Sequence, residues 1–410
     1  MAGALLLVSI IGALLTVNAL RPLRRPDLVG TLSFFPGWLT SELPFHQLVA
    51  QAIATGVLVG LGALNQGPGR AGLAVTLVSW IGLGLIMRRA PGTAAEVESA
   101  LRRGLGDGYL DTVDPPLAHP APIRWRDVAR PFHLKDANVA VDRGLQYRED
   151  GSKAHRLDVY RPAGGRRGCP TLLYIHGGGW VIGDKREQGI PFMLHLAARG
   201  WVCVTANYRL SPRATFPDHL VDVKVALRWV RQHAAEYGAD PAFVVVSGGS
   251  AGGHLAALLA LTANQPEYQP GFEEVDTSVQ GCVCWYGVYD LTNRLKARGR
   301  GFTRFIERTV LKVRFADDPA AFAAGSPMDR VHADAPPTMI VQGSNDTLVP
   351  AAEARHFAAL LRQTSSPVVY AELRGAQHAF EVFRSVRSLH AVHGAGRFCG
   401  YVYATSDRTG

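Results

Sequence analysis

The segment FVVVSGGSAGGHLAALLALTAN, residues 243–264, joins a buried strand, a sharp turn and a helix in immediate succession. Residues 243–246 are a short apolar run of the kind that forms a strand buried on both faces. The turn GGSAG, residues 248–252, is a G-x-S-x-G pattern that holds Ser250 in a strained backbone conformation, with its hydroxyl clear of the sheet. A glycine-rich turn without chemistry is the alternative, and the position between strand and helix favours an exposed, reactive serine.

The rest of the chain from residue 141 alternates strands with helices. The segment at 219–237 has Leu220, Val223, Leu227 and Val230 at three- and four-residue spacing, which predicts a helix with one apolar face. This alternation predicts an α/β fold with a doubly wound, mostly parallel sheet, whose functional residues lie at the carboxyl ends of the strands. The further predicted strands are LDVYRP (157–162), TLLYIH (171–176), WVCVTANY (201–208), VQGCVCWYGV (279–288), TMIVQG (338–343) and PVVYAEL (367–373).

A serine nucleophile requires a base, and the base requires a carboxylate that orients it. Asp346 follows the strand at 338–343, and His378 follows the strand at 367–373, so both are expected at the sheet edge that carries Ser250. Asp290 is the rival acid, because it also follows a strand, but it is better explained as a residue that holds its loop through backbone hydrogen bonds. His176 lies too close to a glycine turn to reach the serine, and we expect it to anchor that turn.

Three consecutive glycines follow the strand at 171–176, in the sequence HGGGW (176–180). Attack on a carbonyl creates an oxyanion, which backbone N–H groups within about 3 Å stabilise. We predict Gly177, Gly178 and Ala251 as these donors. A phosphate-binding loop is the alternative, but no Lys-Ser/Thr pair follows and no helix begins directly at the glycines.

The first 90 residues have the composition of a membrane anchor. Three stretches without charge, at about 3–20, 45–64 and 71–87, approach the ~20 apolar residues that cross a bilayer. A cleaved signal peptide is the alternative for the first stretch, but its positive charges follow the apolar run instead of preceding it. A buried pair of helices in a soluble protein is the alternative for the other two. The segment between the first two stretches, 28–40, is rich in aromatic residues and is expected at the membrane interface.

The arginines around these stretches predict the orientation of the chain. Arginines follow the first and third stretches, and only Arg70 lies between the second and third. By the positive-inside rule, the N-terminus lies outside and everything after residue 88 lies in the cytoplasm, and we expect the membrane to be the plasma membrane. The arginines that follow the first and third stretches are Arg21, Arg24, Arg25, Arg88, Arg89, Arg102 and Arg103.

Composition excludes other classes of protein. The net charge is +9, but no aromatic-interleaved basic stripe or nucleic-acid motif is present, so we expect no nucleic-acid partner. The cysteines are odd in number and four lie in or beside apolar runs, which favours buried free thiols over a disulfide framework or a metal site. We expect no cofactor and no metal. The cysteines are Cys169, Cys203, Cys282, Cys284 and Cys399.

Taken together, the motifs HGGGW, NYRLSP (207–212), GGSAGG, the Asp346 turn and QHAF (377–380) resemble the hormone-sensitive-lipase-like branch of the α/β-hydrolases over about residues 140–385. The resemblance implies a serine carboxylesterase or lipase without a cofactor, with Ser250 as nucleophile, Asp346 as acid and His378 as base. Gly249 replaces the Asp that commonly precedes the nucleophile. The hydrophobic N-terminus and the Ala-, Gly- and Arg-rich composition resemble actinobacterial membrane-associated esterases.

These expectations divide the chain into an anchor (1–90), a linker and lid segment (91–140) and a catalytic domain (141–410) with a cap insertion at about 291–337. The predicted function is hydrolysis of small-molecule or lipid acyl esters by a membrane-anchored enzyme. An acyltransferase or amidase with the same triad is the alternative within enzymes. A binding protein on an inactive scaffold is less well supported, because all three triad residues are present.

Overall fold

Strands of the catalytic domain form one 8-stranded sheet in the order β1-β2-β4-β3-β5-β6-β7-β8. The structure, a computed structural model, describes residues 1–24, 27–119 and 122–406. The strands are parallel from β4 to β8, whereas β1 and β2 are antiparallel to their neighbours. Their bounds are β1 Val139–Gln146, β2 Arg156–Pro162, β3 Cys169–Ile175, β4 Val202–Ala206, β5 Ala239–Gly249, β6 Gly281–Trp285, β7 Thr338–Gly343 and β8 Val368–Leu373. The predicted α/β class with a mostly parallel sheet is therefore confirmed.

The strand that the sequence did not reveal is β1. Most of its residues are only half-buried, and it carries Asp142 and Arg143 in its middle, so it lacks the apolar signature of the interior strands. It pairs with β2 at the edge of the sheet, and the register shifts between Arg143 and Leu145. An edge strand needs less apolar surface than an interior strand, because only one neighbour covers it.

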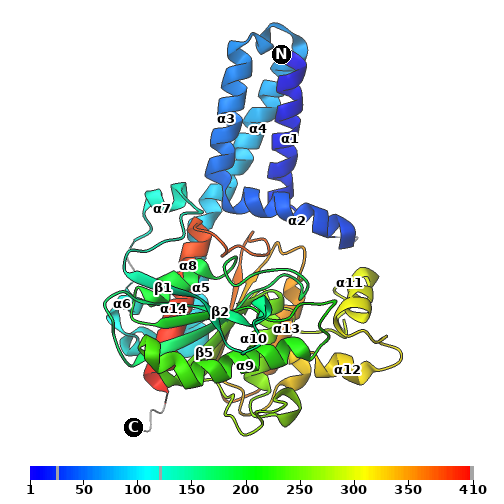
Figure 1. Cartoon of the computed structure of the whole chain (residues 1–410). Coiled ribbons are helices and arrows are strands. Elements are labelled where there is room, and N and C mark those ends of the chain that lie inside the picture. The colour runs from blue at the N-terminus through cyan, green and yellow to red at the C-terminus, as the bar shows by residue number, and fades with distance from the viewer. Residues whose placement is uncertain (25–26, 120–121, 407–410) are drawn as a thin grey trace.

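Helices cover both faces of the sheet (Figure 1). Side chains of α9, α10 and α13 form one apolar core, and side chains of α5, α8 and α14 form the other. Alternate residues of β3 serve the two cores, since Leu173 points to the first and Leu172 to the second. The apolar face predicted for α9 is confirmed, and its four residues are fully buried. The helices are α5 Thr93–Leu105, α8 Ile190–Ala197, α9 Asp218–His233, α10 Ala251–Leu261, α13 Ala351–Leu361 and α14 Val386–Thr405.

The segment 91–140 differs from the expected linker. It begins with η2 (Ala90–Gly92) and α5, and α5 lies against β8 and α14 in the catalytic domain. Val97 and Leu101 are fully buried there. A Cβ at Gly394 of α14 would lie 2.0 Å from a methyl of Val97, so the two helices touch closely. The remaining elements of this segment are η3 Tyr109–Thr112, α6 Pro115–Ala118 and α7 Trp125–Ala129.

The segment predicted to be a cap insertion, about 291–337, lies between β6 and β7. It consists of short helical pieces that project from one side of the domain (yellow in Figure 1). They are α11 Arg300–Phe305, a π-helical turn η7 Ile306–Val310, α12 Pro319–Ala324 and η8 Pro327–Arg330. Short turns elsewhere are η4 Lys153–His155, η5 Ala234–Tyr237 and η6 Pro266–Tyr268. All five cysteines are free and buried, as predicted.

The N-terminal helices form a bundle that stands on the catalytic domain (Figure 1). They are α1 Ala2–Leu20, α2 Asp27–Glu42, α3 Pro44–Gly60 and α4 Gly67–Arg89, with η1 Ala63–Asn65 between α3 and α4. Two of the described helices, Ala2–Leu20 and the continuous Gly67–Leu105, are long and apolar enough to cross a membrane. Helix α3 is shorter, at 17 residues; together with α2 it is a further candidate span, and the two helices are bent by 91° where they meet. Helix α2 lies across the base of the bundle, against the catalytic domain.

The bundle places polar groups inside and large apolar side chains outside. Ser9 and Thr76 share a buried hydrogen bond of 2.7 Å between α1 and α4, and Thr16 and Ser79 share one of 2.9 Å. Gly72 allows close packing, since a Cβ there would lie 2.9 Å from the backbone of α1. Small residues and interhelical hydroxyl pairs are typical of helix packing in lipid. The exposed apolar residues of α1, α3 and α4 include Leu7, Ile10, Ile11, Leu14, Val17, Ile53, Val57, Val78 and Ile81.

Candidate active site

The G-x-S-x-G turn has the strained geometry that the sequence predicted. Ser250 joins β5 to α10 with φ 56° and ψ −121°, a conformation that L-residues rarely adopt. Its N–H donates a hydrogen bond of 2.9 Å to the Trp285 carbonyl oxygen, which ties the turn to β6. A Cβ at Gly252 would lie 2.1 Å from the Ile175 carbonyl oxygen, so only glycine allows the helix to start this close to β3. Ser250 itself is half-buried and reachable.

His378 and Asp346 are brought together by the ends of β8 and β7. The Nδ1 atom of His378 lies 2.7 Å from Oδ2 of Asp346, and both side chains are buried. The other carboxylate oxygen accepts hydrogen bonds from the N–H groups of Leu348 at 2.8 Å and Val349 at 2.7 Å, which fixes the carboxylate. This contact favours the tautomer with its proton on Nδ1, so that Nε2 is left to accept a proton from another group.

Asp290, the rival acid, holds its own loop. Its Oδ1 accepts a hydrogen bond of 3.0 Å from the Thr292 N–H, and its Oδ2 accepts one of 2.8 Å from the Arg294 N–H. These contacts match the loop-holding role expected from the sequence. The geometry therefore favours Asp346 over Asp290 as the carboxylate partner of His378.

Tyr286 connects the histidine to the serine turn. Its ring centroid lies 4.4 Å from that of His378. Its hydroxyl oxygen would lie 3.0 Å from a Cβ at Gly249, the residue before the serine. The glycine that replaces the common acidic residue at this position therefore makes room for a tyrosine.

Behind Tyr286 lies a carboxylate that the motifs did not reveal. Glu381 is fully buried and accepts hydrogen bonds from the hydroxyl groups of Tyr286 and, at 3.1 Å, Tyr174. Burial raises the pKa of Glu381 above its ordinary value near 4.5. Its place, three residues after His378, is the only sequence signal that associates it with the site.

The glycine loop differs in one respect from the prediction. The N–H of Gly177 donates a hydrogen bond of 2.7 Å to Oε1 of Gln188 and therefore has a partner already. The N–H groups of Gly178, Gly179 and Ala251 have no acceptor within the described parts of the chain. Gly177 thus does not offer a free donor here, whereas Gly178 and Ala251 do.

Close packing explains why glycines occupy this loop. Gly178 has φ 113°, and a Cβ there would lie 1.9 Å from the Ile182 carbonyl oxygen. A Cβ at Gly177 would lie 2.6 Å from the Gly249 carbonyl oxygen and 3.0 Å from Cβ of Ser250. The loop therefore presses directly on the serine turn, and side chains at these positions would separate the two.

The histidines beside the two glycine turns are structural. His176 contacts the Gly177 carbonyl oxygen through Nδ1 at 2.7 Å, and its ring stacks on Tyr208 at 4.5 Å between centroids. The sequence-based expectation that His176 anchors the loop agrees with these contacts. His254 lies between the Trp180 indole at 3.2 Å and the Gly325 carbonyl oxygen at 2.7 Å. Burial lowers the pKa of His176 to about 4 and that of His254 to about 3, so both rings are neutral near pH 7.

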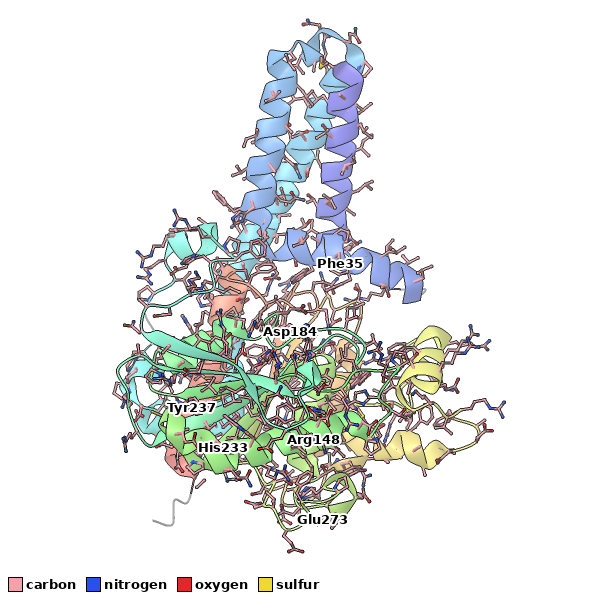
Figure 2. The ribbon with its side chains drawn as sticks, in the orientation of Figure 1. Phe35, Arg148, Asp184, His233, Tyr237 and Glu273 are labelled. Atoms are coloured by element: carbon pink, nitrogen blue, oxygen red, sulfur yellow. The ribbon has the colours of Figure 1, made fainter. Side chains whose placement is uncertain are left out.

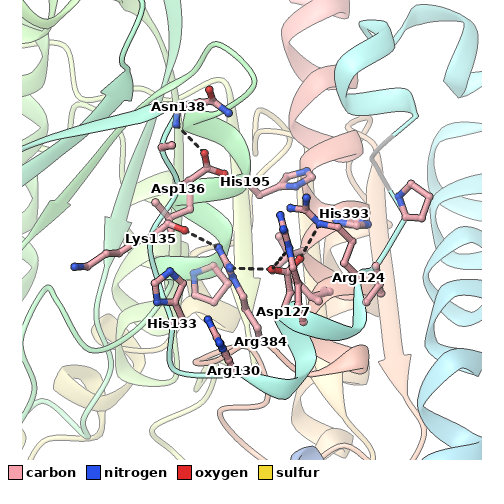
Figure 3. Close-up of a pocket in the computed structure, with 18 of the residues that line it drawn as sticks. Arg124, Asp127, Arg130, His133, Lys135, Asp136, Asn138, His195, Arg384 and His393 are labelled. Carbon is pink, nitrogen blue, oxygen red and sulfur yellow. Dashed lines mark hydrogen bonds and ion pairs between the residues drawn. The ribbon is translucent and has the colours of Figure 1, made fainter.

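A separate, basic cavity of about 550 Å³ lies between α7, α8 and α14 (Figure 3). Asp127 pairs with Arg124 and Arg384 on its wall, and Arg130 and Lys135 add further positive charge. None of the predicted catalytic residues lines it. Across the described residues, no group of three or more His, Cys, Asp or Glu side chains is placed to hold a metal ion.

The parallel sheet, the strained serine turn and the histidine–carboxylate pair at one sheet edge define an α/β-hydrolase. Comparison with known proteins gives the family. The BD-FAE family model matches residues 157–361. The chain is 40% identical to the Mycobacterium tuberculosis protein named "Probable carboxylic ester hydrolase LipM", over 98% of this chain and 93% of that protein. Esterase LipC from the same organism is 36% identical over 78% of this chain and 79% of its own length.

Solved structures agree with this fold. A thermophilic esterase from Thermogutta terrifontis with butyrate bound is 28% identical, with a TM-score of 0.52 over 63% of this chain and 91% of that one. A truncated carbohydrate esterase from gut microbiota, 21% identical with a TM-score of 0.55 over 63% of this chain and 96% of its own, shares the fold. The chain belongs to the hormone-sensitive-lipase-like carboxylic ester hydrolases, as its motifs suggested.

Proposed function

We propose that the protein is a membrane-anchored serine ester hydrolase in which Ser250 is the nucleophile, His378 the general base and Asp346 the orienting acid. The observation that carries this proposal is the 2.7 Å contact between His378 and Asp346 at the sheet edge where Ser250 occupies its strained turn. The names of the curated relatives support ester hydrolysis.

In the proposed reaction, Nε2 of His378 removes the proton from the Ser250 hydroxyl as Oγ attacks the ester carbonyl. The N–H groups of Gly178 and Ala251 stabilise the oxyanion of the tetrahedral intermediate. The imidazolium then protonates the leaving alcohol as the C–O bond breaks, which leaves an acyl group on Ser250. Water, deprotonated by His378, attacks this acyl-enzyme, releases the acid and regenerates the serine. Asp346 stabilises the imidazolium in both halves.

The test is a panel of p-nitrophenyl esters of increasing chain length, hydrolysed by the detergent-solubilised full-length protein and by Ser250→Ala. We expect the variant to lose several orders of magnitude in turnover and to lose fluorophosphonate labelling, with an unchanged melting temperature. Residual turnover within tenfold of wild type would remove Ser250 from the mechanism.

We also propose that α1, α3 and α4 cross the bilayer, with α2 at its surface. The support is the reversal of polarity in the bundle, whose hydroxyl pairs lie inside and whose leucines and isoleucines lie outside. Arg21, Arg24, Arg88 and Arg89 are exposed at the end next to the catalytic domain, and Arg70 is exposed at the far end. Arg25 lies outside the described residues. By the positive-inside rule, this distribution supports an orientation with the catalytic domain in the cytoplasm and the N-terminus outside.

A further inference from the structure

Helix α2 contacts the catalytic residues directly, so the anchor is more than a tether. The ring of Phe34 meets the imidazole of His378 edge-on, with centroids 5.9 Å apart. Four residues further along the helix, the Trp38 indole N–H donates a hydrogen bond of 2.8 Å to the carbonyl oxygen of Ala379. Gly37 lies between them, and a Cβ there would lie 3.4 Å from the amide nitrogen of Gln377. One face of α2 is therefore packed against the loop that carries the base.

The anchor also holds the loop that carries the acid. The guanidinium of Arg24 donates a hydrogen bond of 2.6 Å to the Ser344 carbonyl oxygen. The side-chain amide of Asn345 donates one of 3.1 Å to the Ala19 carbonyl oxygen at the end of α1. Asp346 is the next residue. The loops that carry His378 and Asp346 are thus both held by the end of the anchor that lies next to the catalytic domain.

The other face of α2 is apolar and exposed. Leu28, Leu32, Phe35 and Leu39 recur at three- and four-residue spacing, and each is at least 41% exposed. Figure 2 labels Phe35 on α2, at the junction of the bundle and the catalytic domain. A helix with such a stripe at the end of a membrane-spanning bundle is stable when the stripe lies in the acyl boundary of the bilayer. Helix α2 therefore separates the lipid from the catalytic loops by the thickness of one helix.

A cavity leads past α2 to the catalytic loop. It has a volume of about 650 Å³ and is lined by Thr31 of α2, by Phe302 and Phe305 of the cap helix α11, and by the loop at Asp346. Helices α2 and α11 contact each other. Phe305 also borders the glycine loop, because its ring would lie 3.9 Å from a Cβ at Gly179. The cavity therefore lies between α2 and the cap and reaches the loop of Asp346, and Phe305 links its wall to the glycine loop.

We propose that α2 and α11 form a lateral entrance through which the enzyme draws esters out of the bilayer, with Phe305 on the wall of the cavity and Phe34 at its inner end, where it packs against His378. The substrate class is an amphiphilic ester with a long acyl chain, held in the cytoplasmic leaflet, whose carbonyl reaches Ser250 while the chain stays between α2 and the cap. This inference rests on the proposed ester hydrolase function and on the proposed membrane anchor.

The test compares two esters with the full-length protein reconstituted in phosphatidylcholine vesicles. One is p-nitrophenyl butyrate, which is dissolved in water, and the other is p-nitrophenyl palmitate, which is embedded in the vesicles. We expect Phe34→Ala and Phe305→Ala each to lower the palmitate-to-butyrate ratio of kcat/KM at least tenfold. Trp125→Ala, which removes an exposed aromatic side chain from α7, should leave the ratio within threefold of wild type.

Leu32→Glu provides a variant whose folding is not at issue, because Leu32 is 67% exposed. A charge on the lipid-facing stripe should lower palmitate hydrolysis at least tenfold and leave butyrate hydrolysis within threefold. The proposed entrance would be wrong if Leu32→Glu, Phe34→Ala and Phe305→Ala all kept a palmitate-to-butyrate ratio of kcat/KM within threefold of wild type. If the wild type hydrolyses neither ester, or if Ser250→Ala retains activity, the proposed function fails instead, and the two failures are therefore distinguishable.

Discussion

The backbone N–H of Gly177 donates a hydrogen bond of 2.7 Å to the side-chain oxygen of Gln188. The first glycine of the HGGG loop is thereby tied to a residue eleven positions later. Because Gly177 also presses on the serine turn, this contact fixes the distance between the glycine loop and the nucleophile. Gln188 thus positions the glycine loop beside Ser250, through a contact that no motif indicated.

Gln188→Ala should lower kcat about fivefold with little change in KM, because the lost hydrogen bond contributes about 1 kcal/mol and acts mainly by preorganising the N–H donors for the transition state. Gln188→Glu keeps an acceptor for the Gly177 N–H but adds negative charge beside the oxyanion, so it should also be slow. Kinetics on p-nitrophenyl butyrate with thermal melts would check this. An unchanged kcat for Gln188→Ala would show that the loop holds its shape without the contact.

Asp346→Asn and Asp290→Asn form a matched pair. The first should lower kcat about 10⁴-fold while the protein stays folded, because the histidine loses the carboxylate that orients it. The second should lower the melting temperature and leave the rate per folded molecule within threefold, because the carboxylate of Asp290 holds Thr292 and Arg294 of its own loop. The reverse pattern would make Asp290 the catalytic acid.

Gly178→Ala and Gly179→Ala test the shape of the glycine loop. A Cβ at Gly178 would lie 1.9 Å from a backbone oxygen, whereas the nearest atom to a Cβ at Gly179 is 3.9 Å away. We expect Gly178→Ala to lose about 100-fold in kcat, the scale of a lost oxyanion donor, and also to melt earlier. Gly179→Ala should melt close to wild type, at a cost of about 1 kcal/mol for its positive φ. Equal melting temperatures for the two variants would contradict the clash at Gly178.

Glu381 should make stability depend on pH. Its pKa is raised by burial, so the folded protein retains a proton that the unfolded chain loses near pH 4.5. The contribution of Glu381 to the free energy of unfolding is therefore fully present below pH 4.5. It is lost as the pH rises through the pKa that Glu381 has in the folded protein. Glu381→Gln removes this loss, so its melting temperature relative to wild type should increase from pH 4.5 to pH 8. A constant difference in thermal melts across that range would rule out a raised pKa.

Reporter fusions test the orientation of the anchor. Alkaline phosphatase, which is active only after export, should be inactive when it is fused after Gly92 and active when it is fused at Gln66, in the turn between α3 and α4. The opposite activities would place the catalytic domain outside the cell. Activity at neither site would argue that the bundle does not cross the membrane.

Much of the catalytic domain could be read from local pattern. The interior strands and the serine turn are encoded by neighbours in the sequence, because a strand buried on both faces must be apolar throughout and a strained turn needs glycine beside it. For the same reason Asp346 and His378 were expected at one edge, since parallel strands end on the same side of a sheet. The half-buried edge strand β1 carries no such pattern and was missed.

The relations that complete the site depend on tertiary contacts between residues far apart in the chain. Trp38 and Ala379 are separated by 341 positions, and no periodicity of α2 indicates that its inner face meets the loop of the base. Likewise, the sequence identified Gly177 as a donor, but only packing shows that Gln188 already accepts its N–H. Sequence alone was enough to predict which groups would perform the chemistry, because their types and strand-end positions are local properties. The tertiary structure decided which groups surround them, because packing between distant segments selects those neighbours.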